Sequence, residues 1–124
     1  MTTRMLLLCA CIAIAAVGHI ALAHHWTRRG EATYYGDQYV GQTMACGGTY
    51  RHHKMVAAVR NRRLACGTVV RVKNLRNDRR VRVRIKDYMA RDADAIVDVS
   101  RRAARRLGFL RAGRVRVRMS KVHD

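Results

Sequence analysis

The sequence has 124 residues, with 26 Lys and Arg against 8 Asp and Glu, and a formal net charge of +18 at pH 7. This length excludes more than one domain of ordinary size within these residues. The excess of positive charge favours polyanions as partners: cell-wall polymers, anionic lipid surfaces or nucleic acid.

The first 23 residues have the composition of a secretory signal peptide. One cation, Arg4, precedes an apolar run over residues 5–17, and residues 21–23 give the small-x-small pattern of a cleavage site. We therefore expect cleavage after Ala23 and a basic tail over residues 24–29. The mature chain would be secreted, or would lie in the periplasm or cell envelope.

Two alternatives to this cleavage stay open. The apolar run could be a retained membrane anchor, although Gly18 and His19 interrupt it before it reaches the length of a bilayer span. A lipoprotein signal ending at Cys11 would have only a short apolar segment after Arg4. In the cleaved form we expect no stable membrane anchor.

Short alternating segments make up much of the remaining chain. Apolar side chains alternate with Arg or Lys in three runs, at residues 70–73, 81–86 and 114–119. This period of two predicts strands with one buried and one solvated face. The segment "KNLRNDRR" joins the first two runs as a hairpin with Asn77 and Asp78 at the turn. The segments "EATYYG" and "AIVDVS" predict further strands.

A single segment has a helical pattern. Ser100 is a suitable N-cap, and Gly108 ends the segment. Between them, Ala103, Ala104 and Leu107 share one face. The sequence therefore predicts an all-β fold, a small β-barrel with one short α-helix. A two-sheet sandwich would bury similar residues but would need more strands than the sequence offers.

Two features of the predicted mature chain concern its surface and its cysteines. The three alternating runs point Arg and Lys outward with almost no acid between them, which favours binding to a polyanion. Each of these cations taken alone is an ordinary solvated side chain of a strand. Cys46 and Cys66 would meet an oxidising compartment, where a disulfide is expected. Metal binding by two lone cysteines is the less favoured alternative.

Seven segments in order resemble the rare lipoprotein A (RlpA-like) family, and the resemblance covers residues 30–119. These segments are "GEATYYG", "GQTMACGGTY", "MVAAV", "LACGTVVRVKNL", "RVRVRIKD", "IVDVSRRAARRLG" and "GRVRVRM". The family's members include peptidoglycan lytic transglycosylases, and its wider relatives include expansins and barwin-like proteins. The resemblance implies a six-stranded double-psi β-barrel domain over residues 30–122.

The resemblance also implies a role for Asp87, which matches the aspartate thought to act as the acid/base in lytic transglycosylases of this fold. One carboxyl group serves this reaction: it protonates the glycosidic oxygen between MurNAc and GlcNAc, then takes a proton from the C6 hydroxyl, which closes on C1. The alternative for Asp87 is an aspartate at a strand end that pairs with one of the many arginines. A hydrolase would need a second carboxylate, for which Glu31 is the nearest candidate only by default.

Other residues of the predicted site have binding or structural roles. Asp98 lies two residues before the N-cap Ser100, where a carboxylate can accept backbone N–H groups, so we interpret both as structural. The residues predicted to contact a glycan strand are four tyrosines with flat rings and one cation: Tyr34, Tyr35, Tyr39, Tyr88 and Arg84.

Two departures from the family pattern weaken the enzymatic interpretation. The family's Arg-Gly-Pro after the aspartate is replaced by Tyr88, Met89 and Ala90. The family's histidine aligns onto Val59, which cannot transfer protons, and a two-residue insertion within residues 60–63 follows it. His52 and His53 lie close enough in sequence to reach the groove, although nothing in the spacing requires it. The hypothesis is an exported protein acting on peptidoglycan, with a non-catalytic, cationic, expansin-like wall binder as the alternative.

The partners follow from the same hypothesis. We expect peptidoglycan glycan strands or another anionic wall polymer as the ligand of a monomeric protein, with no cofactor and no metal. Nucleic acid is disfavoured, because the predicted export, the disulfide and the lack of a stacking-aromatic motif argue against it.

Overall fold

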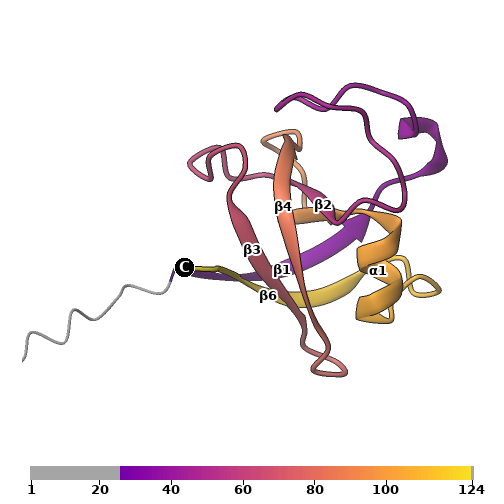
Figure 1. The fold of residues 1–124 in the computed structure, drawn as a ribbon. Coiled ribbons are helices and arrows are strands. Elements are labelled where there is room, and N and C mark those ends of the chain that lie inside the picture. Colours follow the sequence, from indigo (N-terminus) through magenta and orange to yellow (C-terminus); the bar gives the residue numbers. More distant parts are fainter. Residues whose placement is uncertain (1–25, 124) are drawn as a thin grey trace, which may run out of the picture.

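A computed structural model describes residues 26–123 of the chain. Its strands close into a barrel in the order β1-β5-β2-β4-β3-β6 (Figure 1). β1 pairs in parallel with β5, and β2 with β4, whereas the other neighbours are antiparallel. The elements are β1 (Thr27–Tyr34), η1 (Asp37–Tyr39), β2 (Val56–Val59), β3 (Val69–Asn74), β4 (Arg80–Tyr88), β5 (Val97–Val99), α1 (Arg101–Leu107) and β6 (Val115–Lys121). The predicted double-psi barrel with one short α-helix is confirmed.

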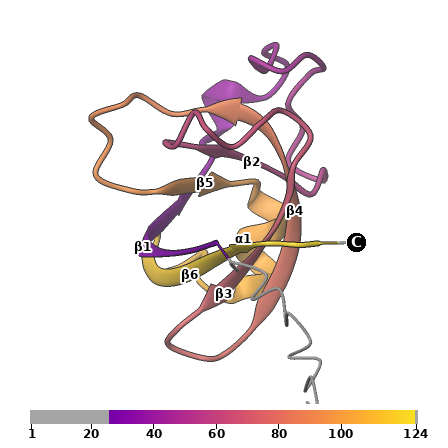
Figure 2. The ribbon, with the colours of Figure 1, turned by 90° about the vertical axis from the view of Figure 1, so that its left-hand side faces the viewer.

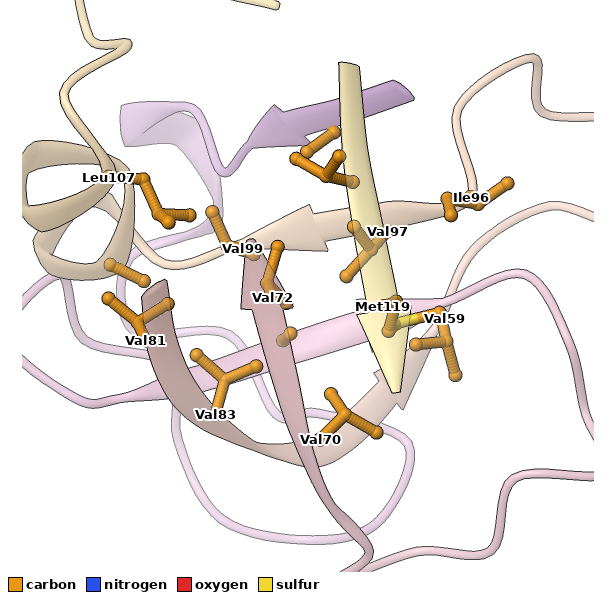
Figure 3. Close-up of a cluster of buried hydrophobic side chains, with 14 of the residues drawn as sticks. Val59, Val70, Val72, Val81, Val83, Ile96, Val97, Val99, Leu107 and Met119 are labelled. Carbon is orange, nitrogen blue, oxygen red and sulfur yellow. The ribbon is translucent and has the colours of Figure 1, made fainter. Parts of the chain in front are cut away.

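The three strands with alternating sequences form one side of the barrel. β3 lies between β4 and β6, and both pairings are antiparallel. Their apolar side chains point into the core, where they meet residues of β2 and β5 (Figure 3). Their Arg and Lys side chains point outward, as the period of two predicts.

α1 begins and ends as the sequence predicts. The Ser100 hydroxyl accepts the backbone N–H of Ala103 at 3.2 Å, which satisfies one of the free donors of the first turn. Gly108 has φ of 78° and ends the helix in the left-handed conformation that glycine adopts without steric cost. The apolar face of α1 is buried against the barrel core.

The β3–β4 hairpin turns at the predicted residues and is tied to α1. Asp78 has φ of 63°, and its N–H donates to the carbonyl of Asn74 at 2.8 Å. The side-chain amides of Asn74 and Asn77 both donate to the carbonyl of Leu107, at 2.8 and 2.9 Å. These bonds satisfy a carbonyl that the end of the helix would otherwise leave without a partner.

β2 differs from the other strands because all four of its residues are buried. Ala57 and Val59 face the barrel core. Val56 and Ala58 face the other way and pack in a second cluster with Tyr35, Met44 and Tyr50. Residues 35–55, including η1, cover this outer side of β2, while β5 runs along its edge (Figure 2). A strand covered on both faces has no alternation, so the period of two does not predict it.

The amino-terminal predictions fall mostly outside the described residues. The expected signal peptide over residues 1–23 and its cleavage site lie there. The described part of the expected tail is ordered: β1 starts at Thr27, and Arg28 and Arg29 pair with β6. Within residues 26–123, the helices are too short and too polar to cross a bilayer.

Candidate functional site

A bulge in β4 decides which way Asp87 points. Ala57 on β2 is opposite Ile85, and the next residue, Ala58, is opposite Asp87, so Lys86 is the extra residue on β4. Without the bulge, Asp87 would share the core-facing side of Ile85. The bulge instead places Asp87 beside Ala58, on the outer face of β2.

A second aspartate reaches the same face from the other side of β2. Asp98 on β5 is also opposite Ala58, and its neighbours Val97 and Val99 are buried in the core. Two strand spacings separate the Cα atoms of Asp87 and Asp98, or about 10 Å. From the sequence, Glu31 is the candidate for a second carboxylate only by default. In the structure Glu31 pairs with Arg114 at 2.5 Å, and Asp98 is the carboxylate that accompanies Asp87.

The two aspartates line a surface hollow of about 280 Å³. We call this hollow the groove. The structure brings together here five of the predicted site residues: Asp87, Asp98, Tyr35, Tyr39 and Tyr88. The remaining lining residues are Ala58, Met89, Ala90 and Ala93.

Three donors hold the carboxylate of Asp87. The backbone N–H groups of Ala45 and Tyr88 donate to Oδ1, each at 3.0 Å. The Tyr35 hydroxyl donates to Oδ2 at 2.9 Å. Within residues 26–123, no Arg or Lys forms an ion pair with Asp87. The carboxylate is therefore fixed by neutral groups and stays half-exposed at the groove.

Asp98 has a different environment. Burial raises its pKa to about 6, the charge of Asp87 adds to this rise, and the hydrogen bond from Thr33 opposes it. The Thr33 hydroxyl donates to Oδ1 at 3.0 Å. The sequence position predicts that Asp98 accepts helix N–H groups, whereas its side-chain partner in the structure is this hydroxyl on the neighbouring strand β1. The sequence signal that could have indicated this position is an acidic residue, Asp98, between two valines of a predicted strand.

The predicted tyrosines occupy distinct environments. Tyr35 is buried and stacks on Tyr50 with ring centroids 4.1 Å apart. Burial, followed by the charge of Asp87, raises the pKa of Tyr35 well above its usual value, so its hydroxyl keeps the proton that it donates. Tyr39 is 43% exposed and contacts the Tyr35 ring edge-on. Tyr39 thus offers the most accessible aromatic surface at the groove.

Two of the predicted binding residues lie elsewhere. The Tyr34 hydroxyl donates to the carbonyl of Leu110 at 2.8 Å, and its ring packs against Phe109. Arg84 lies on the outer face of β4, where its guanidinium donates to the carbonyl of Gly67 at 2.9 Å. Neither residue lines the groove. Tyr88 does, with its hydroxyl anchored to the carbonyl of Leu64 at 2.7 Å.

The predicted disulfide between Cys46 and Cys66 is confirmed. It joins the segment that covers β2 to the loop between β2 and β3. The Cys46 N–H also donates to the carbonyl of Lys86, the bulge residue, at 2.9 Å. These links hold the preceding residue, Ala45, where its N–H reaches Asp87.

Val59, which aligns with the family's histidine, and the nearby His52 and His53 all lie away from the groove. Val59 is fully buried in the barrel core and does not face the groove. His52 bonds through Nδ1 to the Tyr50 hydroxyl at 2.9 Å and through Nε2 to Asp37 at 2.8 Å. The hydrogen bond from His52, together with the charge of Arg101, lowers the pKa of Asp37. Neither His52 nor His53 lines the groove. Among the residues placed by the structure, no three His, Cys, Asp or Glu gather as metal ligands.

A double-psi barrel with a paired-aspartate groove is the class of protein that this fold and site define. The profile of a family described as lytic transglycolase matches residues 27–119. The chain belongs to this RlpA-like family.

Two relatives illustrate the match. The chain is 37% identical over 93 residues to "Endolytic peptidoglycan transglycosylase RlpA" of Pseudomonas aeruginosa, covering 75% of this chain and 27% of that protein. It is 40% identical over 92 residues to an uncharacterized protein of Synechocystis, covering 74% of this chain and 96% of that protein. The chain thus spans about a quarter of the length of the Pseudomonas relative and nearly all of the Synechocystis one.

Solved structures share the fold. An apo expansin of Clavibacter michiganensis aligns with a TM-score of 0.61 and 29% identity, over 80% of this chain and 52% of the expansin. A D78N mutant of the expansin, in complex with cellohexaose, aligns with a TM-score of 0.63, 26% identity and the same coverage. A Streptomyces papain inhibitor aligns with a TM-score of 0.63 and 25% identity, over 79% of this chain and 96% of the inhibitor.

Proposed function

We propose that this protein acts on the glycan strands of peptidoglycan in the cell envelope and cleaves them by lytic transglycosylation, with Asp87 as the acid/base. The observation that carries the proposal is the bulge at Lys86, which turns Asp87 out of the core and into a groove where no arginine of residues 26–123 pairs with it. The family membership and the named activity of the Pseudomonas relative support it. The predicted signal peptide supports export.

The proposed reaction needs one carboxyl group that gives and then takes a proton. Asp87 protonates the oxygen between MurNAc and GlcNAc as the bond from that oxygen to C1 breaks. The Asp87 carboxylate then takes the proton of the C6 hydroxyl as O6 bonds to C1, which yields a 1,6-anhydro end. The ring of Tyr39 and the wall formed by Tyr88 would support the sugars. Asp98, with a pKa of about 6, would keep its proton in mildly acidic conditions and so limit the negative charge beside Asp87.

Digestion of purified peptidoglycan tests this proposal. We expect 1,6-anhydro muropeptides, detected by mass spectrometry, and a loss of rate of about 100-fold or more in Asp87→Asn, the scale of general acid–base catalysis. Asp92→Asn is the matched control, because it removes the same charge from an exposed loop residue. An Asp87→Asn protein as active as the wild type would contradict the assignment.

A second candidate function is wall binding without cleavage. The observation that favours it is Val59, a buried apolar residue at the position where the family's histidine aligns. The expansin complex with cellohexaose, which shares this fold, supports a polysaccharide-binding role. Retention of the protein on peptidoglycan with no soluble product would establish this function in place of the first.

A further inference from the structure

Four arginines surround a second hollow, of about 360 Å³, which lies next to the groove. We call Arg60, Arg62, Arg63 and Arg91 the loop arginines; with Asn61 they line this hollow. Three of them come from the segment that follows β2, which contains the two-residue insertion relative to the family pattern. Arg91 comes from the segment that follows β4. Because β2 and β4 are parallel neighbours, both segments leave the barrel at the same end.

Direct contacts join the loop arginines to the groove. The guanidinium of Arg62 lies over the ring of Tyr88, 5.6 Å from its centroid, and Tyr88 lines the groove. Arg60 donates through Nη1 to the carbonyl of Ala93 at 2.6 Å, and Ala93 lines the groove as well. A polymer lying in the groove and continuing past Tyr88 would therefore run into these cations.

The charge of the loop arginines is not neutralised within the described residues. None of the four forms an ion pair there, and Arg62, Arg63 and Arg91 are exposed. Asp94, in the same segment as Arg91, is paired with Arg114 at 3.1 Å. Asp92 is exposed and forms no ion pair among these residues. Like charges held together in this way repel one another, and a bound anion would relieve the repulsion.

We propose that the loop arginines bind carboxylates carried by the glycan strand, so that the groove selects acidic over neutral glycans. Guanidinium groups suit this ligand because their planar donors match a carboxylate in a bidentate way. The carboxylates can belong to the stem peptides of peptidoglycan or, where a peptide has been removed, to the lactyl groups. The inference rests on the proposed function, since it assumes that the groove holds a glycan strand.

Equilibrium binding tests this inference separately from cleavage. The parent protein carries Asp87→Asn, so that no substrate is consumed. The ligands are soluble peptide-bearing glycan strands, the same strands stripped by an amidase, and chitohexaose as a neutral oligosaccharide. The test variant is Arg62→Gln/Arg63→Gln/Arg91→Gln. The matched control is Arg80→Gln/Arg82→Gln/Arg116→Gln, which removes three exposed charges from the outer faces of β4 and β6.

We expect the test variant to bind the strands that carry the recognised carboxylates about 10-fold to 100-fold more weakly and to bind chitohexaose as the parent does. The control variant should stay within about threefold of the parent for both. Amidase removes the stem peptides and frees the lactyl carboxylates, which are amide-linked in peptide-bearing strands. If the stripped strands bind the parent more tightly, the carboxylates are those of the lactyl groups; if they bind more weakly, the carboxylates are those of the peptides.

Three results would overturn the inference: equal losses in both triple variants, which would reflect net charge alone; a parallel loss of chitohexaose binding; or no loss at all. Thermal unfolding of each variant checks that the fold is intact. The proposed cleavage fails on a different result, the absence of 1,6-anhydro products from the wild-type protein.

Discussion

The two sides of this barrel differ in how their strands distribute buried and exposed side chains. On the side of β3, β4 and β6, each strand alternates between an apolar residue in the core and a cation in solvent. On the side of β2 and β5, side chains on both faces of the strands are covered or line the groove. The first side is a scaffold whose outer face carries cations in solvent. The second side carries the candidate site.

The difference between the two sides shows which positions of this fold carry the candidate catalytic carboxylates. The groove appears at the place where alternation stops, at the bulge of Lys86 and at Asp98 between two core valines. Both features place a carboxylate on a face that the segment 35–55 partly covers. The donors to Asp87 come from that same segment, through Ala45 and Tyr35.

The largest expected effect comes from breaking the alternating side. Ile85 is fully buried, so Ile85→Ala should lower the free energy of unfolding by about 2–5 kcal/mol. Arg82→Gln, on the exposed face of the same strand, should change it by less than about 0.5 kcal/mol. Urea titration followed by circular dichroism measures both. Equal effects of the two substitutions would contradict the assignment of faces on β4.

On the groove side, the pH dependence of stability reports on Asp98. Its pKa rises from 3.8 to about 6 on folding, so the folded state holds this proton more tightly than the unfolded state. The contribution of Asp98 to the free energy of unfolding is therefore largest at low pH. It falls by up to about 3 kcal/mol as the pH rises from about 4 to 6. Asp98→Asn should remove this loss and increase stability at neutral pH.

Asp37 and Asp94 have the opposite effect on the pH dependence of stability, because their neighbours lower their pKa values. Their contribution to stability grows as the pH rises through the acidic range. The informative quantity is accordingly the difference between wild type and Asp98→Asn at each pH, with Asp92→Asn as the control. A difference that does not change between pH 4 and 6 would contradict the raised pKa of Asp98.

The smallest expected effect separates the two tyrosines at the groove. Tyr35→Phe removes the hydroxyl that donates to Asp87 and should cost about 1 kcal/mol of stability, with a reduced rate of cleavage. Tyr39→Phe removes an exposed hydroxyl and should cost less than about 0.5 kcal/mol. Thermal unfolding and peptidoglycan digestion of both variants provide the test. A rate unchanged in Tyr35→Phe would mean that this hydroxyl does not position the acid/base.

The sequence by itself determined the alternating strands, the capped helix, the cysteine pair and the family. Each depends on neighbours in sequence: side-chain direction alternates along a strand, a cap bonds within its own turn, and seven motifs keep their order. The candidate role of Asp87 and its place at a strand end facing the groove also followed from the resemblance, although the bulge at Lys86 did not.

The tertiary structure alone decided which face of each strand became the site. β2 has no alternation because residues distant in sequence cover its outer face, and the bulge at Lys86 exists only in the pairing of β4 with β2. Contacts between residues distant in sequence also place Asp98 beside Asp87 at the groove. Contacts of the same kind hold Tyr34 away from the groove that its neighbour Tyr35 lines. A local pattern records where side chains point along one strand, and it cannot record what the rest of the chain places against them.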